Sequence, residues 1–148
     1  MTPLRLPGIS VDTSVSPARF TFEDGFNAAT PFIDRHVAEG RGDKVLVRTV
    51  AGGTVTYAGL VAGVNRCGNV LLGHGLAPGE RLLMVVKDSV AFYVLFWGAI
   101  KAGIVPVPLN TLLRAKDYAF MIDNAECAAL VYSPEFAGEV EPALASSP

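Results

Sequence analysis

The chain has 148 residues, 51% of them hydrophobic and 18% charged, without a repeat or a low-complexity run. This length allows one domain, or one part of a larger one, to bury a core without help from metals or disulfides. Twelve basic and fourteen acidic residues leave a formal net charge of -2, which provides no basic surface for nucleic acid and excludes it as an expected partner.

Neither a secretion signal nor a membrane span is expected. Residues 1–17 lack the basic-then-apolar order of a signal, so a cytoplasmic, reducing location is the default. The most apolar run, 90–100, is much shorter than the roughly 20 residues that cross a bilayer. The mean hydropathy of +0.40 is high for a free-standing domain and indicates apolar faces that pack against something outside these residues.

Two regions are predicted. Residues 1–21 hold prolines and a glycine among serine and threonine, and we expect an extended, weakly ordered N-terminal arm. Residues 22–148 are expected to form one subdomain. Its first helix is indicated by apolar residues at roughly one helical face, namely Phe26, Ile33 and Val37. This helix begins either near Asn27 or at Pro31, with Thr30 as its N-cap.

A β-hairpin and a long helix are predicted next. Two β-branched runs, 44–50 and 54–57, flank Ala51, and the Gly52-Gly53 pair would let both glycines take positive φ in a tight turn. Thr56 is the expected N-cap of the helix that follows. The apolar stripe of that helix is Leu60, Val64, Cys67 and Leu71.

From residue 81 onward the pattern alternates between strand and helix. Residues 81–87 are apolar on both parities, as in a strand covered on both faces. Residues 89–102 are apolar all round and predict a buried helix. The extended run 104–109 contains Pro106 and Pro108, which cannot donate to a sheet, so it lies at an edge or pairs on one side only.

The alternation continues to the end of the chain. The next helix is indicated by apolar residues at helical spacing: Tyr118, Met121, Ile122 and Ala125. A strand over 127–132 follows, and Ser133-Pro134 opens a last helix. Strands that alternate with helices through short turns predict an α/β fold with parallel strands and crossover helices, preceded by the hairpin.

Chemically capable side chains are few. Lys87 and Asp88 follow an inner strand, where open α/β sheets bind ligands, but a strand-end charge pair with Asp88 at the next helix N-terminus is the stronger interpretation. The aromatic run on the next helix is interpreted as core packing rather than as a pocket for a flat substrate. The residues of this run are Phe92, Tyr93, Phe96 and Trp97.

The remaining candidates are also interpreted as structural. We expect His36 and His74 to be surface histidines, because neither has a metal-ligand neighbour at suitable spacing. Ser89 and Ser133 are expected helix caps. Two cysteines, Cys67 and Cys127, are expected to be buried free thiols. No catalytic, cofactor-binding or metal-binding residue is therefore assigned.

Three strings, in order, resemble one family. Thr56-Tyr57-Ala58-Gly59-Leu60 is similar to the first core motif of adenylate-forming enzymes, although Gly59 replaces the usual acidic residue. The turn 75–81 resembles the segment before the first inner strand of that family. The string 98–110, GAIKAGIVPVPLN, resembles its second core motif. Within the family, 98–113 and the Phe26-Asn27-Ala28-Ala29 opening are most similar to the N-terminal segment of benzoate-CoA ligases and related aryl-CoA ligases.

The resemblance implies the N-terminal part of the large domain of an AMP-forming acyl- or aryl-CoA ligase. The complete enzyme would use ATP, Mg²⁺ and coenzyme A to activate a small aromatic carboxylic acid. The phosphate loop and catalytic lysine of the family have no match in these 148 residues, so we expect this piece to bind no cofactor and to be inactive alone. Its expected partner is the remainder of the same chain.

Two alternatives remain open. One is the N-terminal part of another adenylating enzyme, such as a fatty-acyl-CoA ligase or the adenylation domain of a peptide synthetase. The other is a non-catalytic docking or dimerisation module, for which a homodimer is conceivable. The segments that would choose between the enzymes lie outside these residues.

Overall fold

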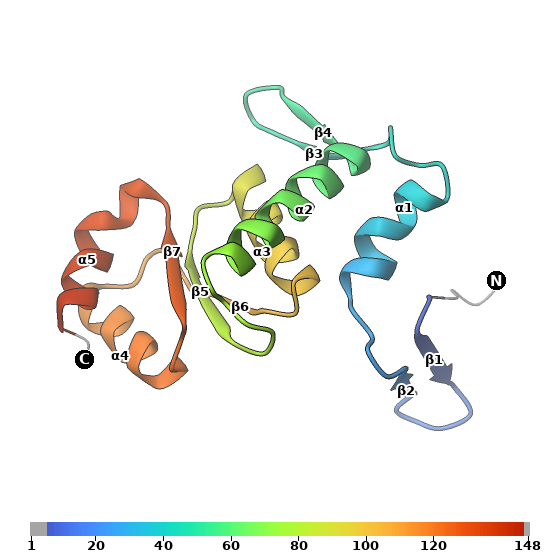
Figure 1. The fold of residues 1–148 in the computed structure, drawn as a ribbon, viewed down its shortest axis with the longest axis horizontal. Helices are drawn as coiled ribbons and strands as arrows, with labels where there is room; N and C mark the ends of the chain where they lie inside the picture. The colour runs from blue at the N-terminus through green and yellow to red at the C-terminus, as the bar shows by residue number, and fades with distance from the viewer. Residues whose placement is uncertain (1–5, 147–148) are drawn as a thin grey trace.

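A computed structural model describes residues 6–146. Its centre is a parallel sheet of three strands: β5 (Arg81–Val85), β6 (Val105–Pro108) and β7 (Ala129–Tyr132). The strand order is β6-β5-β7, so the first of these strands in sequence lies in the middle. Each return to the sheet passes through a helix, which confirms the predicted α/β fold with parallel strands and crossover helices (Figure 1).

Helices cover both faces of this sheet (Figure 1). On one face lie α2 (Tyr57–Gly73) and α3 (Val90–Lys101). On the other lie α4 (Ala115–Ala125) and α5 (Ala137–Ser146), the latter preceded by the short turn η2 (Pro134–Phe136). The three layers thus form the sandwich that a parallel sheet requires.

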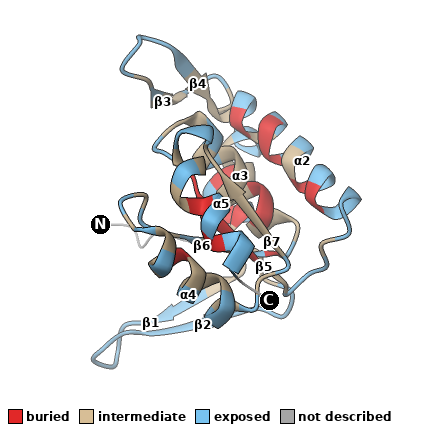
Figure 2. Cartoon of the chain, turned by 90° about the vertical axis from the view of Figure 1, so that its left-hand side faces the viewer, coloured by how far each residue is buried: buried red, intermediate tan, exposed pale blue. Residues whose placement is uncertain are grey.

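The core is built around β5. Leu82, Leu83, Met84 and Val85 are all 0% exposed, which confirms the predicted coverage on both faces. Leu82 and Met84 pack with Leu71 of α2 and Ala99 of α3, while Val85 packs with Tyr118 of α4. Figure 2 shows the buried residues gathered in β5 and on the inward sides of the helices.

The prolines of β6 have the predicted consequence. β6 pairs with β5 alone among the described residues, with Leu82 opposite Pro106 and Met84 opposite Pro108. The ladder is maintained by neighbours that keep their amide: Val105 donates to the carbonyl of Glu80 at 2.8 Å, and Leu109 donates to that of Met84 at 2.9 Å. Since Pro106 and Pro108 lack a donor, β6 belongs at an edge.

The predicted hairpin forms from β3 (Val45–Arg48) and β4 (Thr54–Thr56). Its turn differs in one respect, because only Gly52 has a positive φ, of 85°. Gly53 is instead held by Thr49, whose Oγ1 accepts from the Gly53 amide at 2.9 Å. Thr56 caps α2 as predicted, with its Oγ1 accepting from the amide of Gly59 at 3.2 Å.

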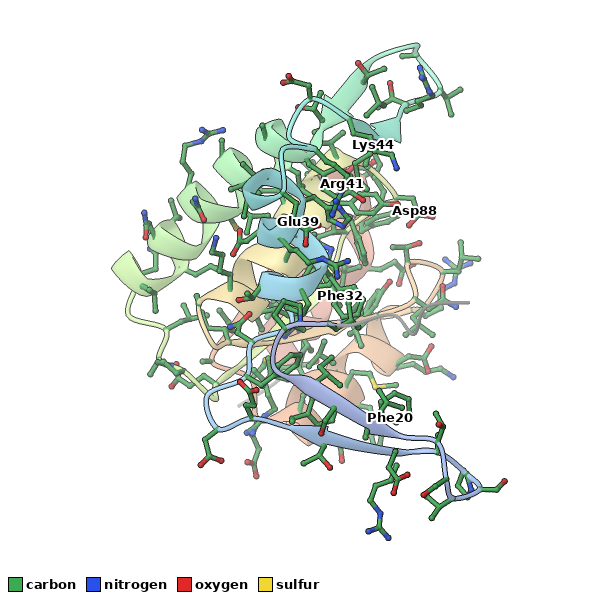
Figure 3. All side chains as sticks on the ribbon, turned by 90° about the vertical axis from the view of Figure 1, so that its right-hand side faces the viewer. Phe20, Phe32, Glu39, Arg41, Lys44 and Asp88 are labelled. Atoms are coloured by element: carbon green, nitrogen blue, oxygen red, sulfur yellow. The ribbon has the colours of Figure 1, made fainter. Side chains whose placement is uncertain are left out.

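The N-terminal region holds a second hairpin that the sequence analysis did not predict. β1 (Ile9–Asp12) and β2 (Arg19–Phe22) pair antiparallel where a weakly ordered arm was expected. Residues 1–5 of that arm lie outside the described residues. One apolar face of the hairpin borders a groove of about 440 Å³ beside the first helix. Phe20 and Phe32 lie on this side of the molecule (Figure 3).

The first helix consists of η1 (Thr30–Asp34), a π-type stretch, continued by α1 (Arg35–Ala38). Its N-cap residue is Ala29, not Thr30, so Pro31 occupies the second helical position. Asn27 starts the turn before it, because its Oδ1 accepts from the amide of Ala29 at 2.9 Å. The true start therefore lies between the two that the sequence left open.

The prediction that α3 is buried all round is wrong. Only Gly98 and Ala99 are buried, and Tyr93 is 42% exposed. The reason is that α3 packs mainly against α2 and the sheet, while its remaining side chains are left partly open by the described residues. The uniformly apolar sequence shows that the side chains of α3 tolerate burial. However, α2 and the sheet cover only part of the surface of this helix.

Candidate functional site

The carboxyl ends of the parallel strands form the candidate site, because ligands of open α/β sheets bind there. Lys87 follows β5, and its backbone amide donates to Oγ of Ser133, which follows β7, at 3.1 Å. The ammonium of Lys87 lies 2.6 Å from a carboxylate oxygen of Glu135. The predicted charge pair of Lys87 with Asp88 is therefore replaced by a pair across two strand ends.

This pair has little structural value, since both side chains are substantially exposed and exposed pairs contribute little stability. The hydrogen bond from Lys87 lowers the pKa of Glu135 below its ordinary value of 4.5. Glu135 therefore stays ionised at neutral pH, and the strand ends present one cation already neutralised by one anion.

The two serines do not cap helices as predicted. Ser89 and Ser133 both occupy N-cap positions, yet neither side chain accepts a helical amide. The hydroxyl of Ser133 is used instead to accept the Lys87 amide, which joins the ends of β5 and β7. The sequence placed both serines correctly at N-cap positions. The Ser133 hydroxyl, however, accepts the Lys87 amide in place of an amide of its own helix.

Asn110, which follows β6, is held in place by α4. The buried Tyr118 hydroxyl donates to its carbonyl at 2.9 Å, and its own Oδ1 accepts from the amide of Leu112 at 2.9 Å. Burial raises the pKa of Tyr118 above its ordinary 10.0, so the phenol remains a donor at neutral pH. Tyr118 thus shapes the loop after β6 and is not available as a base.

An apolar hollow of about 350 Å³ lies between α2, α3 and β7. Cys67 lines it, and burial raises the pKa of its thiol above the ordinary 9.0, so it stays protonated and is a poor nucleophile. Cys67 and Cys127 are both free, as predicted, but each is half-buried rather than buried. The hollow therefore offers apolar contact without a reactive group.

None of the four aromatic side chains of α3 is fully buried, but Phe92, Phe96 and Trp97 pack at partial burial against core clusters, which agrees with the interpretation as packing. Phe92 and Phe96 stack with 6.0 Å between centroids and pack against the sheet, and Trp97 contacts the first helix through Phe32 at 6.1 Å. Tyr93 is the exception, being largely exposed. Each ring has packing partners from α3 or the first helix, so the run does not line a ligand pocket of its own.

The histidines lie apart from the strand ends. His74 is exposed at the end of α2, as predicted, whereas His36 is half-buried and stacked on Tyr57, contrary to the prediction of a surface residue. Within residues 6–146, no three side chains of His, Cys, Asp or Glu are grouped so as to hold a metal ion. Over the same residues, no helix is long and apolar enough to cross a membrane.

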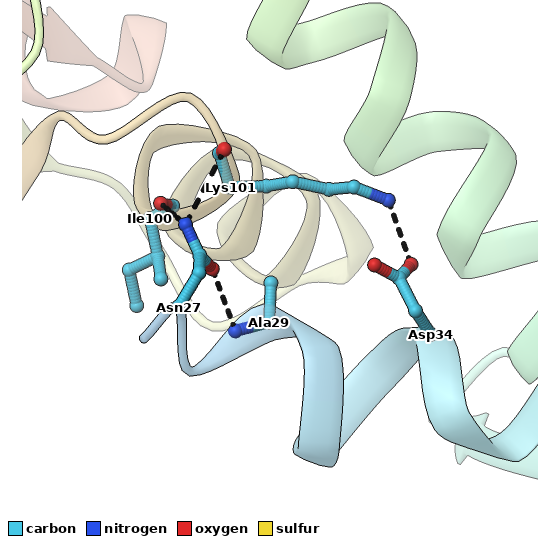
Figure 4. Close-up of polar contacts among 5 residues, drawn as sticks. All are labelled: Asn27, Ala29, Asp34, Ile100 and Lys101. Atoms are coloured by element: carbon cyan, nitrogen blue, oxygen red, sulfur yellow. Dashed lines mark hydrogen bonds and ion pairs between the residues drawn. The ribbon is translucent and has the colours of Figure 1, made fainter. Parts of the chain in front are cut away.

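A polar junction that the sequence analysis missed joins the first helix to the end of α3 (Figure 4). The Asn27 amide nitrogen donates to the carbonyl of Ile100 at 2.8 Å, while its oxygen holds Ala29. Lys101 completes the junction with an ion pair to Asp34 at 2.7 Å. Asn27 therefore links the turn before the first helix to the carbonyl end of α3. No local pattern reveals this link, because Asn27 and Ile100 are 73 residues apart.

Replacement of Asn27 by aspartate should destabilise this junction. Aspartate keeps an acceptor for Ala29 but loses the donor to Ile100, and it sets a negative charge against the carbonyl end of α3. A partly buried acceptor left without its donor costs about 1–3 kcal/mol, and we expect urea unfolding to show a loss in that range. Asn110→Asp, which keeps its acceptor role towards Leu112, is the control and should change stability less.

The geometry of the described residues defines an α/β unit with three parallel strands, whose candidate edge carries packing and turn contacts. The model of the AMP-binding enzyme family matches residues 34–147. The chain therefore belongs to the AMP-binding enzyme family, in agreement with the resemblance found in its motifs.

Several known proteins are similar to it. The 4-hydroxybenzoate–CoA/benzoate–CoA ligase of Rhodopseudomonas palustris is 42% identical over 123 residues, which are 83% of this chain and 23% of that protein. The crystal structure of a benzoate CoA ligase from Burkholderia xenovorans LB400 superimposes with a TM-score of 0.77 at 35% identity, over 82% of this chain and 24% of that one. A long-chain-fatty-acid–CoA ligase of Mycobacterium tuberculosis is 40% identical over 78 residues, 53% of this chain and 16% of that protein. The chain thus spans about a quarter of the length of the aryl-CoA ligases that it matches.

Proposed function

We propose that the chain is the N-terminal part of an aryl-CoA ligase that activates a small aromatic carboxylic acid. The observation that supports this most directly is the extent of similarity. The benzoate-type relative matches 83% of the chain, whereas the fatty-acyl relative, at comparable identity, matches 53%.

The reaction proposed for the complete enzyme has two steps. The carboxylate oxygen attacks the α-phosphorus of ATP, forming an acyl-adenylate and releasing pyrophosphate. The thiol of coenzyme A then attacks the acyl carbon, and AMP leaves with the bonding electron pair. Mg²⁺ would neutralise phosphate charge during the first step.

The described residues do not fit a nucleotide or magnesium site by themselves. The cation at the strand ends, Lys87, is already paired with Glu135, and no triad of metal-ligating side chains is assembled within residues 6–146. No step is therefore assigned to a residue of this chain. Its proposed contribution is a scaffold: β5 and α3 support the strand ends against which the other parts of a ligase would be built.

The proposal includes partners and location. Apolar side chains exposed on the N-terminal hairpin, on the first helix and on α2 are proposed to pack against further polypeptide of the same ligase, which agrees with the coverage of about a quarter. Phe20, Phe32 and Val70 are examples, being 59%, 47% and 56% exposed. The two free cysteines agree with a reducing, cytoplasmic location.

The test is an assay of two proteins, the chain of 148 residues and the product of the whole reading frame that encodes it. Each is incubated with ATP, Mg²⁺, coenzyme A and either benzoate, 4-hydroxybenzoate or palmitate. We expect aroyl-CoA from the whole product and no ATP–pyrophosphate exchange from the 148 residues alone. Palmitoyl-CoA as the main product would favour the fatty-acyl alternative, and a whole reading frame that ends at Pro148 would favour a docking or dimerisation module.

A further inference from the structure

His36 lies where the first helix meets the start of α2. Its ring stacks on that of Tyr57, the first residue of α2, with 4.0 Å between the centroids. Its Nδ1 accepts a hydrogen bond from Nε of Arg41 at 3.1 Å. The face of the ring therefore contacts α2, and its edge contacts the loop that follows α1.

The hydrogen bond from Arg41 requires a neutral ring. A ring nitrogen that accepts a hydrogen bond has no proton, whereas both nitrogens of an imidazolium are donors. Protonation of His36 at Nδ1 would thus turn an attractive contact with the Arg41 guanidinium into two opposed donors with like charge. The charged ring has no tautomer that leaves Nδ1 free to accept from Arg41, because both of its nitrogens carry a proton.

The charges around His36 also oppose a proton. Arg35 on the same helix, and Arg41 and Lys44 on the loop, all act on it as cations, and Glu39 is the only anion among these groups. Glu39 is already shared, at 3.9 Å from Arg35 and in contact with Arg41. Figure 3 shows Glu39, Arg41 and Lys44 gathered on one side of the molecule.

The groups that face His36 from other elements do not supply an anion. Tyr57 of α2 presents its ring. Asp34, on the same helix as His36, is engaged with Lys101. Burial, and next the charge of Arg41, lower the pKa of His36 below its ordinary 6.5. A lowered pKa means that the closed arrangement is most stable above pH 6.5 and loses that stability as the pH falls through the lowered value.

The loop also makes two backbone hydrogen bonds to the first turn of α2, and the one to Lys44 continues the β3–β4 pairing, in which Val45 lies opposite Thr56. The amide of Ala58 donates to the carbonyl of Gly42 at 2.9 Å, and that of Tyr57 donates to the carbonyl of Lys44 at 3.1 Å. Gly42 also packs closely, since a Cβ there would lie 3.5 Å from that of Ala58. The contact between the loop and α2 is therefore small and includes no large buried side chain of the loop. The repulsion caused by a proton on His36 has only this contact to overcome.

We propose that His36 is a proton-operated latch: the neutral ring joins residues 35–44 to the first turn of α2, and protonation releases this segment while the sheet and its helices stay folded. Each pKa unit between the released and the closed forms changes their ratio by about tenfold. The device therefore responds over the weakly acidic range, where histidine is the side chain that ordinarily changes charge.

The test combines two NMR measurements on the chain of 148 residues. A titration of the His36 ring protons gives its pKa, and hydrogen exchange at about pH 7.5 and about pH 5, corrected for the intrinsic rate, gives the protection of individual amides. We expect protection of the Ala58 and Tyr57 amides to fall at the lower pH, by about tenfold for each unit of pKa shift. Protection of the Leu83 amide, in the core strand β5, should not change.

Two variants separate a latch from a merely structural ring. His36→Gln retains a side-chain acceptor for Arg41 but takes no proton, so the exchange of Ala58 should no longer depend on pH after correction. Arg41→Gln removes the nearest cation, so the pKa of His36 should move up towards its ordinary value. The proposal is overturned if His36→Gln shows the same acid-induced loss of protection as the wild type, if the wild type shows none, or if Leu83 loses protection together with Ala58.

Discussion

Replacement of Gly98 by valine is expected to lower the free energy of unfolding by about 3 kcal/mol, the upper end of the usual cost of overpacking. Gly98 is where α3 crosses α2 most closely. A Cβ at this position would lie 2.8 Å from Cβ and 2.9 Å from Sγ of Cys67, and 3.2 Å from the carbonyl of Val64. The Val64 carbonyl is backbone and cannot rotate away, so the two helices would have to separate.

Urea unfolding followed by circular dichroism measures this loss, and Gly138→Ala is the matched control. Gly138 is also helical, in α5, but a Cβ there meets nothing within 4 Å, so alanine should raise stability by up to about 1 kcal/mol through helix propensity. In a double mutant, Cys67→Gly removes both contacting side-chain atoms, and its effect should combine with that of Gly98→Val less than additively. Strict additivity would contradict the contact described here.

Replacement of Leu82 by alanine should cost about 2–5 kcal/mol, the range for deleting a fully buried leucine side chain. Leu82 is 0% exposed and lies in the central strand, with β6 on one side and β7 on the other. Its side chain belongs to the cluster that includes Leu71 and Ile104. Because β5 is paired with a strand on each side and covered by helices on both faces, the resulting cavity cannot close by a local shift.

Leu112→Ala is the control for this prediction. Leu112 is 84% exposed in the loop after β6, and substitutions at such positions change stability by less than about 0.5 kcal/mol. Thermal unfolding of both variants provides the comparison. If Leu82→Ala were as stable as Leu112→Ala, the assignment of β5 as the centre of the core would be wrong.

The proposed place in an aryl-CoA ligase rests on similarity to known ligases and not on catalytic side chains of the described residues. The chemically capable groups are an ion-paired lysine after β5, a tyrosine of α4 whose pKa is raised by burial, and a thiol of α2 whose pKa is raised by burial. Tyr118 holds the loop after β6, whereas the exposed pair of Lys87 with Glu135 contributes little stability.

Local patterns in the sequence determined much of the fold. The apolar run at 81–87 predicted a strand covered on both faces, and the prolines of 104–109 predicted an edge position or pairing on one side, because each depends on backbone chemistry that neighbouring residues cannot alter. The cap at Thr56 was predicted for the same reason. The ordered motifs also indicated the family, which the family match over residues 34–147 confirms.

Contacts between distant segments were decided only by the tertiary structure. Asn27 joins Ile100, Lys87 pairs with Glu135, and the hydroxyl of Ser133 binds the Lys87 amide rather than its own helix. The packing of strands and helices brings each of these partners near. They compete with the local partners that the sequence predicts for helix caps and charge pairs, and the sequence alone does not reveal them. A side chain with several possible partners takes the one that the fold places within hydrogen-bond distance, and that distance is a property of the packed layers.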